Sequence, residues 1–167
     1  MSRLARILGL VAICAAVQGG PAIDAQSASA NLQVTASVSK NCTITTSPVN
    51  FGAYDPITAH KTSNLDGQGT LTVTCTRGAG AKVALAAGAN ALGTVRRMQD
   101  GAASYLTYEL YQDSSRSTPW GEGTSAKDLA TALNSSPRDF VVYGRVPSGQ
   151  DAAVGNYNDT VVATVNF

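Results

Sequence analysis

The strongest constraint on the fold of this chain is a period of two in its hydrophobic residues, repeated in many short runs. Apolar side chains alternate with small or polar ones in most of these runs, as expected of a β-strand with one buried face, whereas residues 104–113 are partly apolar on both faces and residues 138–146 are mostly apolar. The clearest runs are residues 31–38, 69–76, 81–88, 104–113, 138–146 and 159–167. Strict alternation over so few residues favours strands over amphipathic helices.

Turn-forming residues separate these runs. Glycine, proline, asparagine and aspartate cluster in segments such as "SPVNFG", "DGQG" and "VPSGQD". Small β-type residues dominate the composition, and aromatic residues make up only 6%. Together these features predict an all-β, antiparallel sandwich of one domain. The pattern of residues 125–136 fits a short helix, a turn or an irregular strand. The helix is an option because Ser125 could be its N-cap and Leu129 and Leu133 stand four positions apart.

The first residues are typical of a secretory signal peptide. Arg3 and Arg6 precede an apolar run at residues 7–17, and several alanines follow. The run has 11 residues, whereas a membrane-spanning helix needs about 20. We therefore expect residues 1–25 to be cleaved, with residue 30 as the alternative end, and no membrane insertion of the mature chain.

Charge and cysteine content change with this cleavage. Loss of Arg3, Arg6 and Asp24 turns twelve basic and eleven acidic residues into ten of each, so no basic field would attract nucleic acid. With Cys14 removed, Cys42 and Cys75 remain, and an even count in an exported chain predicts a disulfide between them.

No catalytic or cofactor motif is recognisable in the sequence. His60 stands in the polar segment "TAHKTSN" without a nucleophile or an orienting acid, so a solvated loop histidine is the favoured interpretation. Trp120 is expected as a lid on the sandwich end rather than as an exposed sugar-binding residue. Five aspartates near turns, Asp55, Asp66, Asp100, Asp113 and Asp159, are expected to cap those turns rather than to bind a metal. We expect no enzymatic activity and no cofactor.

The last run, "DTVVATVNF", predicts a strand whose partner is missing from the sequence that follows. Its apolar face consists of Val161, Ala163, Val165 and Phe167. An uncovered apolar strand is an aggregation hazard, so the partner is expected elsewhere in the chain or in another chain. Just before it, Tyr157 in "GNY" fits either a tyrosine corner, whose hydroxyl bonds back to the chain, or an exposed turn.

Several motifs in a fixed order resemble a known family. They are Cys42 followed by "FGAY", then "GTLTVTCTRG", "VALAAGAN", "LTYELYQDSSRS", "WG" and the terminal "GNYNDTVVATVNF". The chain from Leu32 to Phe167 is similar to the spore coat protein U domain family, which includes the pilins of archaic chaperone–usher pili. The resemblance implies an incomplete immunoglobulin-like (pilin) sandwich at residues 39–167, which encodes six strands and lacks the seventh and last.

The resemblance also implies how the missing strand is supplied. A periplasmic chaperone would lend it first, and a neighbouring subunit would later donate its N-terminal extension as an outer-membrane usher assembles a homopolymer. Residues 26–38 would be that extension. Its donor side chains would be Leu32, Val34, Ala36 and Val38, although residues 32–38 could instead form the first strand of their own domain. The implied function is a surface pilus subunit for attachment and biofilm formation, and the alternative is a non-fibrous spore or cell coat protein.

Overall fold

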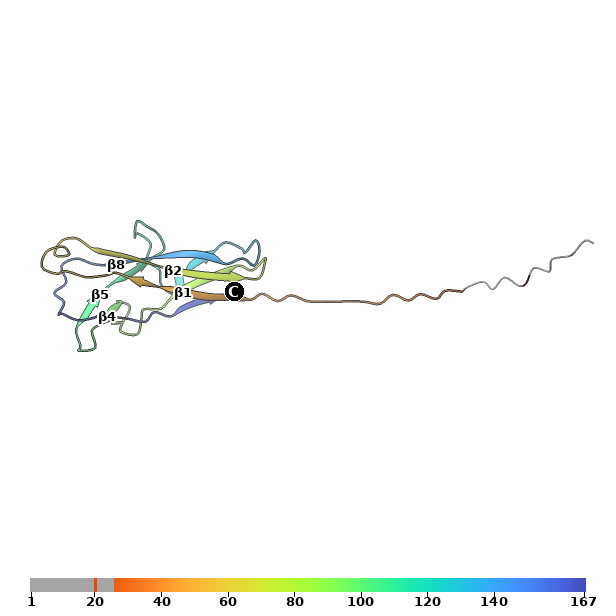
Figure 1. Cartoon of the computed structure of the whole chain (residues 1–167), viewed down its shortest axis with the longest axis horizontal. Coiled ribbons are helices and arrows are strands. Elements are labelled where there is room, and N and C mark those ends of the chain that lie inside the picture. Colours follow the sequence, from red (N-terminus) through yellow and green to blue (C-terminus); the bar gives the residue numbers. More distant parts are fainter. Residues whose placement is uncertain (1–19, 21–25) are drawn as a thin grey trace, which may run out of the picture. The chain divides into compact units, whose positions relative to one another are not determined.

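The computed structural model describes residue 20 and residues 26–167, and all of its regular elements except one short 3₁₀ turn are β-strands (Figure 1). The predicted signal peptide, residues 1–25, falls almost entirely outside the described residues. The strands are β1 Cys42–Asn50, β2 Leu65–Cys75, β3 Ala81–Leu85, β4 Arg97–Gln99, β5 Tyr105–Thr107, β6 Glu109–Tyr111, β7 Lys127–Leu129, β8 Arg138–Val146 and β9 Ala163–Asn166. The predicted all-β class is confirmed.

The strands form antiparallel sheets. A four-stranded sheet has the order β1-β2-β8-β6, a three-stranded sheet has the order β7-β3-β9, and β4 pairs with β5. The end strands of the two larger sheets are β1 and β6 in one and β7 and β9 in the other. Segments distant in sequence therefore meet, since the last strand β9 pairs with β3 near the middle of the chain.

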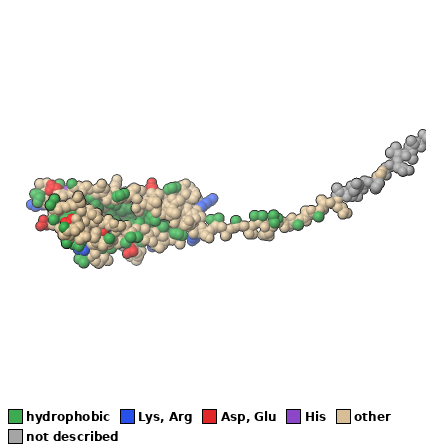
Figure 2. Space-filling view, turned by 60° about the horizontal axis from the view of Figure 1, so that its bottom comes forward, with side chains coloured by type: hydrophobic (Ala, Val, Ile, Leu, Met, Phe, Trp, Pro, Cys, Tyr) green, Lys and Arg blue, Asp and Glu red, His purple; other side chains and the backbone are tan. Residues whose placement is uncertain are grey.

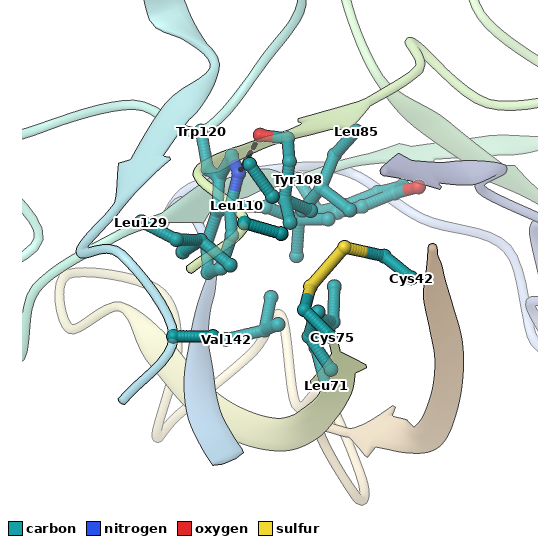
Figure 3. Packing of buried hydrophobic residues seen from close by; sticks show 14 of the residues in the cluster. Cys42, Leu71, Cys75, Leu85, Tyr108, Leu110, Trp120, Leu129 and Val142 are labelled. Carbon is teal, nitrogen blue, oxygen red and sulfur yellow. Dashed lines mark hydrogen bonds between the residues drawn. A yellow bond between two sulfur atoms is a disulfide. The ribbon is translucent and has the colours of Figure 1, made fainter. Parts of the chain in front are cut away.

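The buried core lies where the alternation predicts it. Leu71 and Val73 of β2 face inward together with Val83 and Leu85 of β3. The run at 104–113 places Leu106, Tyr108 and Leu110 inside while Tyr105 stays exposed. Figure 3 shows several of these side chains converging on one cluster around Trp120 and the disulfide. The period of two thus determines which face of each strand is buried.

One local expectation needs correction, and one segment that the sequence left ambiguous is resolved. The first strand of the sandwich begins at Cys42, and residues 26–41 contain no strand. The run at residues 31–38, a possible first strand of the domain, is therefore not a strand in the described structure, and β1 starts at Cys42. In the ambiguous segment 125–136 there is no α-helix: a 3₁₀ turn at Gly123–Ser125 precedes the short strand β7, and irregular chain follows. Pairing of β7 with β3 outweighs the weak helical spacing there.

The predicted disulfide is present. Cys42 and Cys75 stand directly opposite each other on β1 and β2, and their sulfur atoms are bonded (Figure 3). The bond closes a loop of 33 residues in sequence separation. It fastens the edge strand β1 to the sheet at the point where the chain enters the domain.

Reduction of this disulfide is expected to lower the free energy of unfolding. Closing a loop of this length contributes about 3.5–4 kcal/mol in the chain-entropy model. We expect the paired variant Cys42→Ser, Cys75→Ser to reproduce the effect of a thiol reagent in urea denaturation. A denaturation midpoint unchanged by reduction would contradict the prediction, and the thiol reagent should leave the paired variant unaffected.

Candidate functional site

The candidate site is a groove between the edge strands β1 and β9. These strands belong to different sheets, yet their Cα atoms approach within 8 Å. The groove continues along the segment that precedes β9, as far as residue 152. Hydrophobic core residues line its floor. Figure 2 shows hydrophobic side chains gathered in a hollow on one face of the domain.

The groove consists of two adjoining cavities of about 470 and 670 Å³. The smaller one reaches core side chains, among them Leu71, Leu85 and Leu110. The larger one reaches Leu65, Leu106 and Val146 at the far end of the sandwich. The two cavities share the wall residues Pro48, Val49, Phe51, Met98 and Tyr157. The core of the sandwich is thus accessible along one side.

Residues 47–51 form one wall because glycines let them cross the four-stranded sheet. The pairing of β1 with β2 becomes irregular between Ser47 and Asn50. A Cβ atom on Gly144 would stand 2.6 Å from the Phe51 ring, closer than real side chains come. Glycine at this position therefore lets Phe51 lie over the sheet, where its ring is 6.1 Å from that of Tyr108.

The last strand supplies the opposite wall. Val161, Ala163 and Val165 are half-buried while their neighbours Val162 and Thr164 are exposed, which confirms the predicted alternation. Phe167 is 53% exposed. None of these four predicted inward residues is fully buried. The apolar face of this strand therefore remains incompletely covered by the described residues.

One edge of the β9 backbone is hydrogen-bonded to β3, and the other edge faces the groove. The N–H of Ala86 donates to the Val162 carbonyl at 2.9 Å, on the side of β3. Because bonding direction alternates along an antiparallel strand, the N–H and C=O groups of Ala163 and Val165 point toward the groove. An extended segment laid along this edge would find both hydrogen-bonding groups and apolar side chains.

A polar pair lies beside the apolar groove. The Tyr108 hydroxyl donates to the Asp159 carboxylate at 2.7 Å, and the same carboxylate accepts the N–H of Asn90 at 3.0 Å. Burial, together with the neighbouring Asp159 carboxylate, raises the pKa of Tyr108 far above its usual value, so the phenol stays a neutral donor. This pair holds the chain before β9 against the strand segment that carries Tyr108.

The tyrosine-corner interpretation of Tyr157 is confirmed. Its hydroxyl donates to the Ala153 carbonyl at 2.9 Å, and its ring borders both cavities. The contact stabilises the loop that enters the last strand. An exposed turn, the other interpretation, does not fit this half-buried side chain.

The candidate donor segment is exposed. Leu32, Val34 and Val38 are 88%, 83% and 84% exposed, Ala36 is exposed as well, and none of them lies in a strand. These side chains make no intramolecular core in the described structure. Their role as a donor strand stays a prediction.

The residues considered for catalysis have structural contacts. His60 stacks on Tyr54, with ring centroids 5.0 Å apart, and its Nδ1 accepts the N–H of Asp55 at 2.8 Å. Trp120 is fully buried, so an exposed sugar-binding role is wrong. Within residues 26–167 no three metal-binding side chains come together. In the same part of the chain, no helix is long and apolar enough to cross a membrane.

The aspartates divide into two groups. Asp55, Asp100 and Asp113 accept backbone N–H groups in turns, as expected. Asp66 instead forms a two-point ion pair with Arg145 across neighbouring strands, and Asp159 bonds Tyr108. The expectation of turn capping is wrong for these last two residues.

One wall of the groove has no counterpart among the site residues expected from the sequence. Val49, Phe51 and Met98 are absent from that set, although each borders both cavities. "SPVNFG" has the pattern of a turn because Pro48 and Gly52 flank it. The alternation of Val49 with Phe51 is the signal that could have identified a strand-like wall.

Comparison with known proteins gives consistent results. The model of the family "Spore Coat Protein U domain" matches residues 28–164. "Protein U" of Myxococcus xanthus is 39% identical over 176 residues, which cover 96% of each chain. A solved structure of the CsuC–CsuE chaperone–tip adhesion subunit pre-assembly complex, from archaic chaperone–usher Csu pili of Acinetobacter baumannii, matches with a TM-score of 0.59 at 20% identity. That match covers 78% of this chain but only 40% of the solved chain, so it concerns the fold alone.

Proposed function

The chain belongs to the Spore Coat Protein U domain family, and we propose that it is a structural pilus subunit that polymerises by donor-strand exchange. In this proposal residues 39–167 form an immunoglobulin-like sandwich without its last strand. The extended arm of another copy, residues 26–38, occupies the groove between β1 and β9. The product is a fibre at the cell surface that serves attachment and biofilm formation.

The observation that carries the proposal is the groove itself. Its floor is hydrophobic core, and its β9 wall has an available backbone edge next to half-buried apolar side chains. A closed sandwich would cover these residues with a strand of its own. An added strand completes the ladder and covers the apolar face, which is a recurrent way of binding an extended peptide.

The arm has a matching pattern. Leu32, Val34, Ala36 and Val38 lie on one face of an extended chain and are exposed in the described structure. Burial of the leucine and the two valines would contribute about 5–9 kcal/mol before the cost of ordering the arm. Neighbouring strands lie about 4.8 Å apart, so an inserted strand needs about 9.6 Å between β1 and β9. The closest Cα atoms of the two strands approach within 8 Å, so insertion at that point requires the two strands to separate.

Export and assembly follow from the same proposal. The signal peptide would direct the chain across the inner membrane, and a periplasmic chaperone would cover the groove until an outer-membrane usher adds the subunit to the fibre. The structurally similar Csu protein belongs to a chaperone–subunit pre-assembly complex, which supports this class of partner. The family and the contacts of His60 and Trp120 support a structural rather than an enzymatic role.

Deletion of residues 26–34 from the exported protein tests the proposal. The truncated subunit keeps its groove but lacks Leu32 and Val34, so we expect a monomeric, chaperone-bound subunit and no polymer. Electron microscopy and gel filtration of the secreted material measure the outcome. A variant with Gln33→Ala and Thr35→Ala, on the other face of the arm, is the control and should assemble. Normal fibres from the truncated chain would refute the donor assignment.

The second candidate function is a non-fibrous coat protein of spores or cells. The family description and the 39% identity to Protein U over nearly the whole chain favour it. Such a protein could use the same groove and arm to build a layer. Ordered filaments in the secreted material would favour the pilus, whereas sheets without filaments would favour the coat.

A further inference from the structure

The sandwich has two chemically different ends. At one end lie Cys42, Cys75 and Arg138, where β1 and β8 begin and β2 stops. We call it the arm-root end, because the extended arm enters the domain there. At the other end lie Leu65 and Val146, beside the larger cavity of the groove. We call it the groove-mouth end.

The arm-root end carries an excess of cations. The N–H of Thr76 donates to the Asn41 carbonyl at 2.8 Å, which places Lys40 and Arg77 at the same end. Arg138 is there too, at the first position of β8, but its Nη1 donates to the Ala130 carbonyl and its Nε and Nη2 are buried. The exposed positive charge at this end is therefore that of Lys40 and Arg77. These three cations form no salt bridge with a described residue, whereas Lys82 is paired with Asp128. Asp139, bonded to Thr72, is a carboxylate at this end.

The groove-mouth end carries an excess of carboxylates. It consists of the β1–β2 loop with Asp55, the β4–β5 turn with Asp100 and the loop after β8 with Asp151. None of these three forms a salt bridge with a described residue, and Lys61 is the cation in the same loops. Asp66 is neutralised by Arg145 and Arg116.

Two of these carboxylates, those of Asp55 and Asp100, have a lowered pKa and remain ionised well below neutral pH. Hydrogen bonds from the Thr58 hydroxyl and the N–H groups of Thr58 and Ile57 hold the pKa of Asp55 below its usual value. The N–H of Ala102 does the same for the pKa of Asp100. The negative charge at this end therefore persists across the ordinary working range of pH.

A head-to-tail fibre brings these opposite ends together. The acceptor's own arm leaves from its arm-root end, so an incoming arm must exit at the groove-mouth end for the chain of subunits to continue. Val38 of the inserted arm and Cys42 of its domain are four residues apart, and Lys40 lies midway between them. Four residues span at most about 14 Å, and charges interact over about 8–10 Å at physiological salt. The donor's cations therefore come within range of the acceptor's carboxylates.

We propose that subunits select their head-to-tail orientation through this contact between the cationic arm-root end of one copy and the anionic groove-mouth end of the next. The inference rests on the proposed donor-strand function and adds a second recognition surface outside the groove. Complementary charge at an interface rim steers encounter and rejects wrong orientations more than it adds affinity. Two ends that carry charge of the same sign repel each other, so dimers that bring like ends together are disfavoured.

Charge reversal of the full chain tests the contact through the rate of polymerisation, followed by light scattering. The variant K40E/R77E places carboxylates at both ends, and we expect its rate to fall at low salt by about tenfold or more. D151K alone should also slow polymerisation of the wild-type chain. In the K40E/R77E background, D151K should instead accelerate polymerisation, because the two ends again differ in charge. E122K, in the loop before β7, changes net charge as D151K does and should have little effect.

A labelled arm peptide of residues 26–38 separates this inference from the proposed function. The peptide has no charged side chain, so its binding to the full-chain groove should not depend on salt or on Lys40 and Arg77. Peptide binding together with the reversed effect of D151K supports the end contact. Peptide binding with polymerisation insensitive to salt and to all three substitutions would overturn the end contact and leave the groove intact. Failure of the peptide to bind would overturn both.

Discussion

Aspartate at both Val161 and Ala163 is expected to abolish polymerisation. These side chains border the smaller cavity and form the β9 wall of the groove. An inserted arm would bury two carboxylates without cationic partners, and each buried, unpaired charge costs several kcal/mol. Binding of the arm peptide should therefore weaken by more than about a thousandfold, a factor that about 4 kcal/mol suffices to produce.

The adjacent residues of the same strand provide a matched control. Val162 and Thr164 alternate with Val161 and Ala163 and are exposed. V162D/T164D adds the same two charges to the outer face, so polymerisation and peptide affinity should stay near the wild-type values. Circular dichroism and thermal unfolding of both variants verify that each remains folded. Full polymerisation by V161D/A163D would show that this face does not receive the donor.

Replacement of Trp120 by alanine is expected to give the largest loss of stability among single substitutions. Trp120 is fully buried in the core cluster (Figure 3), and its Nε1 donates to the Val83 carbonyl at 2.9 Å. Its own carbonyl accepts a hydrogen bond from the guanidinium of Arg96 at 2.9 Å. Truncation of a buried tryptophan costs about 3–5 kcal/mol. It also leaves the Val83 carbonyl without this donor inside the core.

Urea denaturation of Trp120→Ala and Trp120→Phe measures the two contributions. Phenylalanine keeps most of the apolar volume but lacks the N–H donor. The Trp120→Phe variant should therefore lose clearly less free energy of unfolding than the Trp120→Ala variant. Leu133, which is 86% exposed, offers a surface control: Leu133→Ala should change stability by less than about 0.5 kcal/mol. A Trp120→Ala domain as stable as the wild type would contradict the packing described for the core.

Which residues of a strand point to the core could be predicted from the sequence, because it depends on local geometry. Alternating side chains point to opposite faces of a strand, so Leu71, Val73 and Val83 are identified as inward residues without knowledge of their partners. The same rule predicts the half-buried face of the last strand. The disulfide followed from export and an even number of cysteines.

The groove wall could not be predicted because it depends on contacts between distant segments. Phe51 lies against the sheet only because Gly144, more than ninety residues later, has no side chain. In the same way Asp159 has the local pattern of a turn residue, and its bond to Tyr108 arises from the packing of two elements. Residues 32–38 alternate like a strand but have no strand partner in the described structure, since alternation alone does not identify the chain that supplies one.

The burial of loop residues is another feature that could not be predicted from the sequence. Trp120 precedes a glycine in a segment rich in turn residues, and nothing in that spacing separates a buried ring from an exposed one. Its burial follows from the approach of β3 and from Arg96, whose guanidinium bonds the carbonyls of Leu85 and Ala86 as well. Side chains that are satisfied by backbone groups of another element leave no local sequence signal.

Hydrogen exchange at the groove-facing amides of Ala163 and Val165 tests the central claim most directly. In the subunit without a donor these amides should exchange rapidly, because they point away from β3 toward the open edge. In the assembled polymer a donor backbone should accept their hydrogen bonds and slow exchange by orders of magnitude, while Thr164 changes little. Equal and slow exchange in both states would mean that the chain already closes its own sandwich.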